Sequence, residues 1–142
     1  MKRSLFVLLL LLFFLSGCVS PSVTLISDED SVRVSVEVAD TLEERRVGLM
    51  HREFLDENKG MLFIFEDAQP RTFWMKNTLI PLDIIFISDD LQILNIAQAV
   101  PCREDPCVLY PSEGSARYVL EVNQGFIEKR GIIIGDKVQL NL

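Results

Sequence analysis

Residues 32–38 read VRVSVEV, with a valine at every second position. Side chains alternate between the two faces of a β-strand, so the valines share one face while arginine, serine and glutamate share the other. This period predicts a half-buried strand whose valines lie in the core. The first element therefore indicates a domain built from strands that each give one face to the interior.

Further runs along the chain are rich in apolar, aromatic or branched residues and are of strand length. They cover residues 60–65, 71–78, 82–88, 91–100 and 117–122, and turn signals such as Asp89-Asp90 separate them. Residues 131–138, GIIIGDKV, suggest a turn at Gly135-Asp136 into a final strand. The pattern predicts seven or eight short strands.

Helices occupy a smaller part of the prediction. Thr41 and Glu44 have the spacing of a capping box, which starts a helix that extends to about Arg52, with Leu42, Leu49 and Met50 toward the core. Gly48 inside this helix favours close packing or an early helix end. A second short helix is expected over residues 123–130. The fold class is therefore mainly β (α+β): a compact β-sandwich, jelly-roll-like or barrel-like domain with one or two short helices.

The N-terminus has the pattern of a lipoprotein export signal. Lys2 and Arg3 precede an apolar run over residues 5–15, and Leu15-Ser16-Gly17-Cys18 has lipobox spacing. A membrane anchor is the alternative, but eleven residues give about 16 Å of helix against a hydrocarbon core of about 30 Å. We expect residues 1–17 to be removed as a signal peptide, 18–30 to form the lipidated Cys18 and a tether that can hold one short strand at 23–26, and 31–142 to form a single globular domain. The predicted location is extracytoplasmic, with the membrane bound through lipid on Cys18.

The charge balance narrows the class of partner. The chain has 14 basic and 21 acidic side chains; without Lys2 and Arg3 the balance is 12 − 21, or −9. A surplus of acidic groups disfavours nucleic acid as a partner. It also disfavours attachment to anionic lipid through a basic patch, which leaves the acyl chains as the expected attachment. An envelope protein or polymer is the further partner expected of a binding module.

Cys102 and Cys107 are the two cysteines that remain after Cys18, and their even number and short spacing predict a disulfide in an exposed, proline-bracketed loop. Zinc is the alternative, but it prefers four ligands and the chain has a single histidine, His51. We therefore expect neither a metal site nor a cofactor.

The central stretch over residues 72–87, TFWMKNTLIPLDIIFI, places polar residues against an apolar pattern. Asp83 shares a strand face with Ile85 and Ile87, so its carboxylate lies at a wet end of the strand or needs a partner. One interpretation is structural: an ion pair or a turn cap. The other is functional and places Trp74, Lys76, Asn77 and Asp83 on the rim of a cleft, with tryptophan as a stacking surface.

Several separated segments together resemble the domain-of-unknown-function 192 family, also called uncharacterised protein family 0127. The similarity covers about residues 31–142. It is carried by Glu37 to Thr41, Glu44-Arg45, Gly48 to Met50, Gly60 to Phe63, Phe73 to Thr78, Pro81 to Asp83 and Gly135-Asp136. The resemblance implies a compact β-rich domain, often exported, with no established reaction. By resemblance, the signature positions are Arg45, Gly48, Met50, Arg52, Trp74, Lys76, Asn77, Thr78, Pro81 and Asp83.

Three hypotheses for function follow. The first is a non-catalytic binding or interaction module of the cell envelope, with Arg45, Trp74, Lys76, Asn77 and Asp83 at the ligand. The second is an envelope hydrolase with carboxylate chemistry around Asp83, paired with Glu121. The third is a structural or assembly factor. A histidine-based triad has no local motif in the sequence, and the catalytic residues of any reaction stay unassigned.

Overall fold

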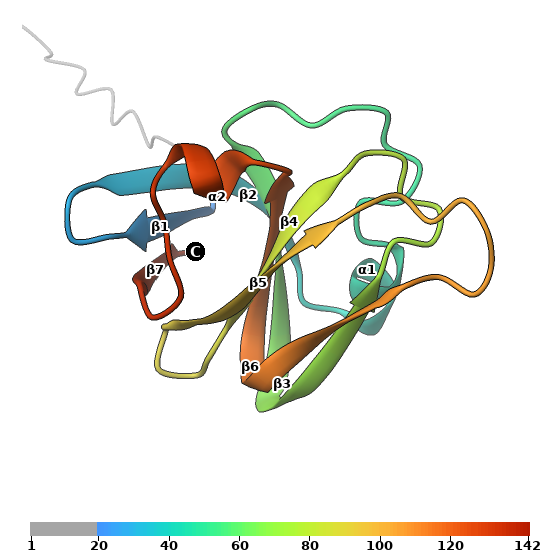
Figure 1. Cartoon of the computed structure of the whole chain (residues 1–142). Coiled ribbons are helices and arrows are strands. Elements are labelled where there is room, and N and C mark those ends of the chain that lie inside the picture. The colour runs from blue at the N-terminus through green and yellow to red at the C-terminus, as the bar shows by residue number, and fades with distance from the viewer. Residues whose placement is uncertain (1–19) are drawn as a thin grey trace, which may run out of the picture.

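The computed structural model describes residues 20–142, which form one seven-stranded sheet that curls into a half-barrel (Figure 1). The strand order is β5-β4-β6-β3-β2-β1-β7; β2 pairs with β3 in parallel, and the other neighbours are antiparallel. The strands are β1 (Ser22–Ile26), β2 (Ser31–Ala39), β3 (Lys59–Trp74), β4 (Leu82–Ile87), β5 (Ile93–Ala99), β6 (Leu109–Asn123) and β7 (Lys137–Asn141), and the helices are α1 (Leu42–Val47) and α2 (Phe126–Lys129). The predicted mainly β class is confirmed.

The two faces of the sheet carry separate apolar cores. Because side chains alternate along a strand, Leu62 and Phe63 of β3 belong to different cores. The first, here the α2-side core, includes Leu25, Ile85 and residues of α2. The second, the α1-side core, holds Phe63 with residues that follow α1. The principal members of the α1-side core are Leu49, Met61, Phe63, Met75, Leu82, Ile84, Phe86 and Val119.

Main-chain contacts join the beginning of β5 to the beginning of β7. The N–H of Ile93 donates to the carbonyl of Asp136 at 3.0 Å, and the N–H of Val138 donates to Leu91 at 2.9 Å. These bonds bring the two edges of the curled sheet together at one end. The turn predicted at Gly135-Asp136 leads into the final strand β7, whereas the apolar residues 132–134 before it are not a strand, and Ile133 is 63% exposed.

Residues 22–26 correct the predicted start of the globular domain. They form β1, which pairs with both β2 and β7, and Val23 and Leu25 are fully buried. The sheet therefore begins at Ser22 rather than near Ser31, and the short strand expected at 23–26 belongs to the sheet rather than to a tether. The lipobox and Cys18 lie outside the described residues.

Helix α1 begins as predicted and ends early. The Thr41 hydroxyl accepts from the Glu44 N–H while the Glu44 carboxylate accepts from the Thr41 N–H, which completes the capping box. Gly48, at φ +50°, ends the helix at a backbone angle that favours glycine. Leu42 is 79% exposed, so its predicted place in the core is wrong, whereas Leu49 is buried as expected.

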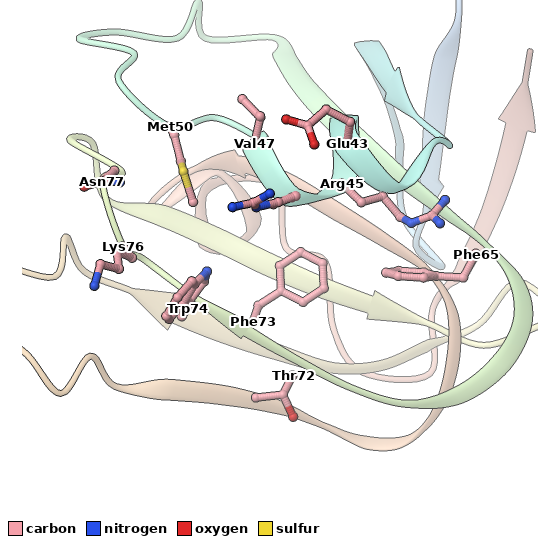
Figure 2. A pocket seen from close by; sticks show the side chains of 11 residues that line it. Glu43, Arg45, Val47, Met50, Phe65, Thr72, Phe73, Trp74, Lys76 and Asn77 are labelled. Atoms are coloured by element: carbon pink, nitrogen blue, oxygen red, sulfur yellow. The ribbon is translucent and has the colours of Figure 1, made fainter.

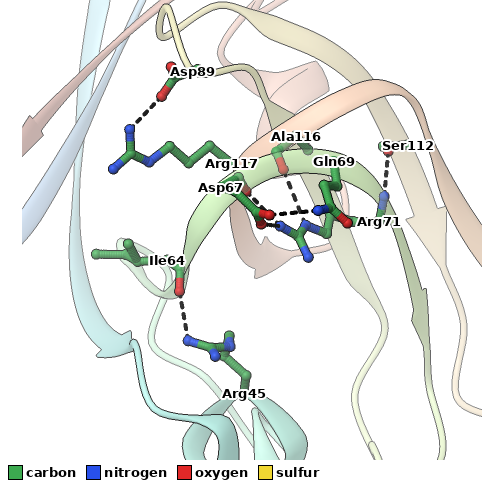
Figure 3. A network of polar contacts seen from close by, with 9 residues as sticks. All are labelled: Arg45, Ile64, Asp67, Gln69, Arg71, Asp89, Ser112, Ala116 and Arg117. Carbon is green, nitrogen blue, oxygen red and sulfur yellow. Dashed lines mark hydrogen bonds and ion pairs between the residues drawn. The ribbon is translucent and has the colours of Figure 1, made fainter.

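Strands β3 and β6 form a long bent pair that is longer than predicted. Their register shifts between Ile64 and Gln69 and again between Pro70 and Thr72. Arg71 braces this bend: its guanidinium donates to the carbonyl and carboxylate of Asp67 and to the carbonyl of Ala116 (Figure 3). The same guanidinium lies 4.0 Å from the centroid of the Phe65 ring. The bend re-aims the second half of β3. None of the helices within residues 20–142 is long and apolar enough to cross a membrane.

Candidate ligand-binding groove

A groove of about 610 Å³ lies between α1 with its following turn and the second half of β3. Figure 2 shows Val47 and Met50 on one wall, and Phe73 and Trp74 on the other. Its lining combines apolar and charged side chains. The lining residues are Glu43, Arg45, Arg46, Val47, Met50, Phe65, Thr72, Phe73, Trp74, Lys76 and Asn77.

Backbone contacts beyond α1 hold the two walls together. Gly48 donates its N–H to the Glu44 carbonyl at 2.8 Å and turns the chain, so that Leu49 enters the core and Met50 borders the groove. The next residue, His51, donates its N–H to the Asn77 carbonyl at 2.8 Å. His51 and Asn77 both have positive φ, 63° and 56°. Two tight turns therefore meet at this end of the groove and fix its width.

The charged side chains of the groove are mainly basic. Arg45 donates to the carbonyls of Asp40 and Ile64, the latter at 2.9 Å, so its guanidinium is positioned by backbone rather than neutralised by a carboxylate (Figure 3). Lys76 lies 3.1 Å from Asp105 in an exposed ion pair. Arg46 has no ion pair with any described residue. Such an arrangement leaves positive charge available to an anionic ligand.

Trp74 and its neighbour Phe73 have opposite roles. Phe73 packs edge-on between Phe63 at 5.0 Å and Phe86 at 5.8 Å, which anchors the strand in the α1-side core. Trp74 is 49% exposed, with the Lys76 ammonium 5.7 Å from its ring. An exposed indole held by an anchored strand is a rigid surface on which a ring can stack.

Next to the groove lies a smaller recess of about 40 Å³, and Glu121 is one of its lining residues. Glu121 is on β6, 5% exposed, on the face that carries Ile84 and Val119. Burial raises the pKa of its carboxyl to about 8. Its side chain is therefore predominantly a neutral acid at pH 7, able to donate one hydrogen bond and accept others.

Asp83 lies on the opposite face of the sheet from Glu121, because Asp83 pairs with Val122 whereas Ile84 pairs with Glu121. One Asp83 carboxylate oxygen accepts from the Ile127 N–H at the start of α2 at 3.1 Å; the other has no hydrogen-bond partner among the described residues. Burial raises the pKa of Asp83, and the N–H groups of α2 oppose that shift. Asp83 therefore holds α2 against the sheet. This agrees with a structural role for Asp83 rather than with a place on the rim of a cleft.

The structure brings four of the five predicted ligand residues to the groove: Arg45, Trp74, Lys76 and Asn77. It places Asp83 elsewhere and does not form the suggested Asp83–Glu121 pair. Sequence reasoning did not assign Arg46, Phe65 or Phe73 to the site. The sequence predicts Glu121 only as a partner of Asp83, although its place on the buried face of an apolar strand is a signal of its own.

The predicted disulfide between Cys102 and Cys107 is confirmed, with sulfur atoms 2.02 Å apart. The loop that it closes carries Asp105, the partner of Lys76, and the Cys102 N–H donates to the Met75 carbonyl at 3.3 Å. The disulfide loop therefore borders the groove at its Lys76 end.

Comparison with known proteins places the chain among relatives without an assigned reaction. It is similar to the UPF0127 protein PF1050 of Pyrococcus furiosus, 24% identical over 115 residues that cover 78% of this chain and 90% of the relative. A crystal structure of a protein of unknown function from Novosphingobium aromaticivorans is 40% identical, with TM-score 0.78 and 83% of each chain covered. A second, from Sinorhizobium meliloti 1021 and named a "putative transcription regulator", is 36% identical, with TM-score 0.79, over 87% of this chain and 98% of that one.

The family model described as Uncharacterized ACR, DUF192, matches residues 23–140, a span that contains both cores, the groove and Glu121. The match begins inside β1, in agreement with the place of that strand in the sheet. The chain belongs to the DUF192 family.

Proposed function

We propose that this protein is a lipid-anchored binding module of the cell envelope whose groove takes an anionic ligand that offers a ring to Trp74. The charge of the groove carries the proposal. Arg45, Arg46 and Lys76 line it against a single acidic side chain, Glu43, in a protein of net charge −7. A basic groove on an acidic protein draws anions to that place and repels them elsewhere.

The proposed location rests on the N-terminal pattern. Lys2, Arg3, the apolar run and the lipobox ending at Cys18 favour export and attachment by lipid. The ligand would then be an acidic unit of an envelope polymer or of an envelope protein. Transcription regulation, which the name of the Sinorhizobium relative suggests, is disfavoured here, because residues 20–142 carry 21 acidic and 12 basic side chains.

Thermal unfolding of the full-length chain in mild detergent tests the binding. The probes are two ring carboxylates, glucuronate and cyclohexanecarboxylate, and neutral glucose. A ligand at 100 times its Kd stabilises the folded state by about 2.7 kcal/mol, a shift of several degrees. We expect at least one carboxylate to give this shift and glucose to give none. Absence of a shift with both carboxylates would contradict the proposal.

Matched variants locate the site. Arg46→Gln is expected to abolish the shift, whereas Lys129→Gln, which removes the same charge on α2, should leave it unchanged. Trp74→Ala should weaken binding with little loss of stability because its side chain is half exposed. Ile133→Ala, at another exposed apolar residue that lies outside the groove, is its control. If each variant and its control lost the ligand-induced thermal shift to the same extent, the ligand would bind somewhere other than the groove.

A further inference from the structure

Glu121 is a buried acid that the fold does not use. Glu121 is only 5% exposed, yet no described residue makes a hydrogen bond or an ion pair with its carboxyl. Asp83, the comparable acid on the other face, is bonded to the main chain of α2. Burying a polar group without a partner costs about 1–3 kcal/mol, so an unpaired carboxyl in the lining of an open recess points to a partner that arrives with a ligand.

The recess opens into the groove. Six residues line both: Arg45, Arg46, Val47, Met50, Phe73 and Trp74. Its volume of about 40 Å³ admits one group of the size of a water molecule, whose share of liquid volume is about 30 Å³. A ring stacked on Trp74 can therefore send one small substituent toward Glu121, but the ring itself stays in the groove.

The chemistry of the recess selects that substituent. Leu49, Phe63 and Phe73 provide apolar walls, which make a charged group costly there. A neutral carboxyl offers one O–H donor and a carbonyl acceptor, and a hydroxyl offers the same pair in return. We infer that the recess is a hydroxyl-binding subsite, so that the ligand of the groove is an acidic sugar with one ring hydroxyl bonded to Glu121. This inference rests on the proposed function.

Burial, rather than the charges of the recess, keeps Glu121 neutral. The other charged side chains that line the recess are Arg45 and Arg46 of α1. Strand β3 contributes Phe63 and Phe73, the following loop contributes the Thr78 hydroxyl, and β4 places Ile84 beside Glu121. Desolvation by burial is the cause of the raised pKa of Glu121. Ionisation of Glu121 removes the donor and adds a negative charge facing an anionic ligand.

The test compares glucuronate with cyclohexanecarboxylate, which keeps the ring and the carboxylate but lacks the hydroxyls. Affinities of the full-length chain are measured by calorimetry from pH 7 to pH 9. The wild type is expected to prefer glucuronate at pH 7 and to lose about tenfold in glucuronate affinity by pH 9, because the protonated fraction of an acid with pKa about 8 falls tenfold over that range. Cyclohexanecarboxylate affinity should change little.

Two variants isolate Glu121. The amide of Glu121→Gln still donates and accepts but does not titrate, so glucuronate affinity should persist and become independent of pH. Glu121→Met keeps the side-chain volume but has no hydrogen-bond donor, so it should reduce the affinity for glucuronate to the affinity for cyclohexanecarboxylate. Circular dichroism checks that each variant is folded, and if the methionine variant is not, the pH profile of the glutamine variant decides.

The outcomes separate the two proposals. Equal binding of both carboxylates with no dependence on pH would overturn the hydroxyl subsite and leave the anion groove standing. The same pH dependence in wild type and Glu121→Gln would also overturn it, since another group would then be titrating. Failure of both carboxylates to bind would overturn the groove and the subsite together.

Discussion

Glu121 makes the stability of the free protein depend on pH in an unusual direction for a carboxyl. Its folded-state pKa, about 8, lies above the ordinary 4.5, so the folded chain binds this proton more tightly than the unfolded chain. The stabilisation is complete below pH 4.5 and is lost as pH rises through about 8. Within that window the Glu121 contribution to the free energy of unfolding should fall by up to about 1.4 kcal/mol per pH unit.

Urea unfolding at intervals from pH 5 to pH 9 measures this slope. Glu121→Gln is the control, because it retains the shape of the side chain without the proton. As pH rises, the free energy of unfolding of the wild type should fall relative to that of Glu121→Gln. Parallel curves across the range would contradict the burial of an uncharged Glu121.

At the scale of elements, β1 is an integral part of the sheet rather than a segment of the tether. Strand β1 lies between β2 and β7, and its Leu25 is fully buried in the α2-side core. Leu25→Ala should lower the free energy of unfolding by about 2–5 kcal/mol, the range for a buried leucine. Leu42→Ala, at an exposed leucine of α1, is the matched control and should stay within about 0.5 kcal/mol. Chemical denaturation of both variants checks this; equal, small effects would show that β1 is dispensable.

Local patterns predicted the elements that local forces form. The valine alternation of β2, the apolar run of β4 and the capping box of α1 all appear in the structure at the expected places. Strands β3 and β6 are longer than predicted because residues 66–72 and 109–116 are largely polar or exposed and become strands by pairing with one another. That pairing is a contact between distant segments, which periodicity within either segment does not reveal.

The groove was predictable in part for the same reason. Trp74, Lys76 and Asn77 are close in sequence, and their polar and aromatic character against an apolar pattern singled out residues that line the groove. Asp83 is also a polar residue in an apolar pattern, but it lies outside the groove. Its carboxylate accepts from the backbone of α2, and a backbone partner cannot be recognised from residue types in the sequence. The recess depends on how α1 packs across the sheet over β6, which no local spacing encodes.

For the whole molecule, the disulfide loop is expected to add stability without determining the fold. Cys102 and Cys107 are five residues apart, and closing so short a loop contributes about 2 kcal/mol in the chain-entropy model. Reduction should lower the free energy of unfolding by that amount and leave the circular dichroism of the sheet intact. The double variant Cys102→Ser/Cys107→Ser should not respond to reductant. Loss of the sheet on reduction would show that the loop organises more than the Lys76 end of the groove.

The position of β1 also sets how near the domain stands to a bilayer. Four residues lead from Cys18 to Ser22, the first residue of β1, and four extended residues reach at most about 14 Å. With Cys18 acylated, as we propose, the β1–β7 side of the molecule is held against the lipid headgroups. Figure 1 shows α1 on the opposite side from β1 and β7. The groove would then face away from the membrane that holds the protein, toward polymers and proteins in the space beyond it.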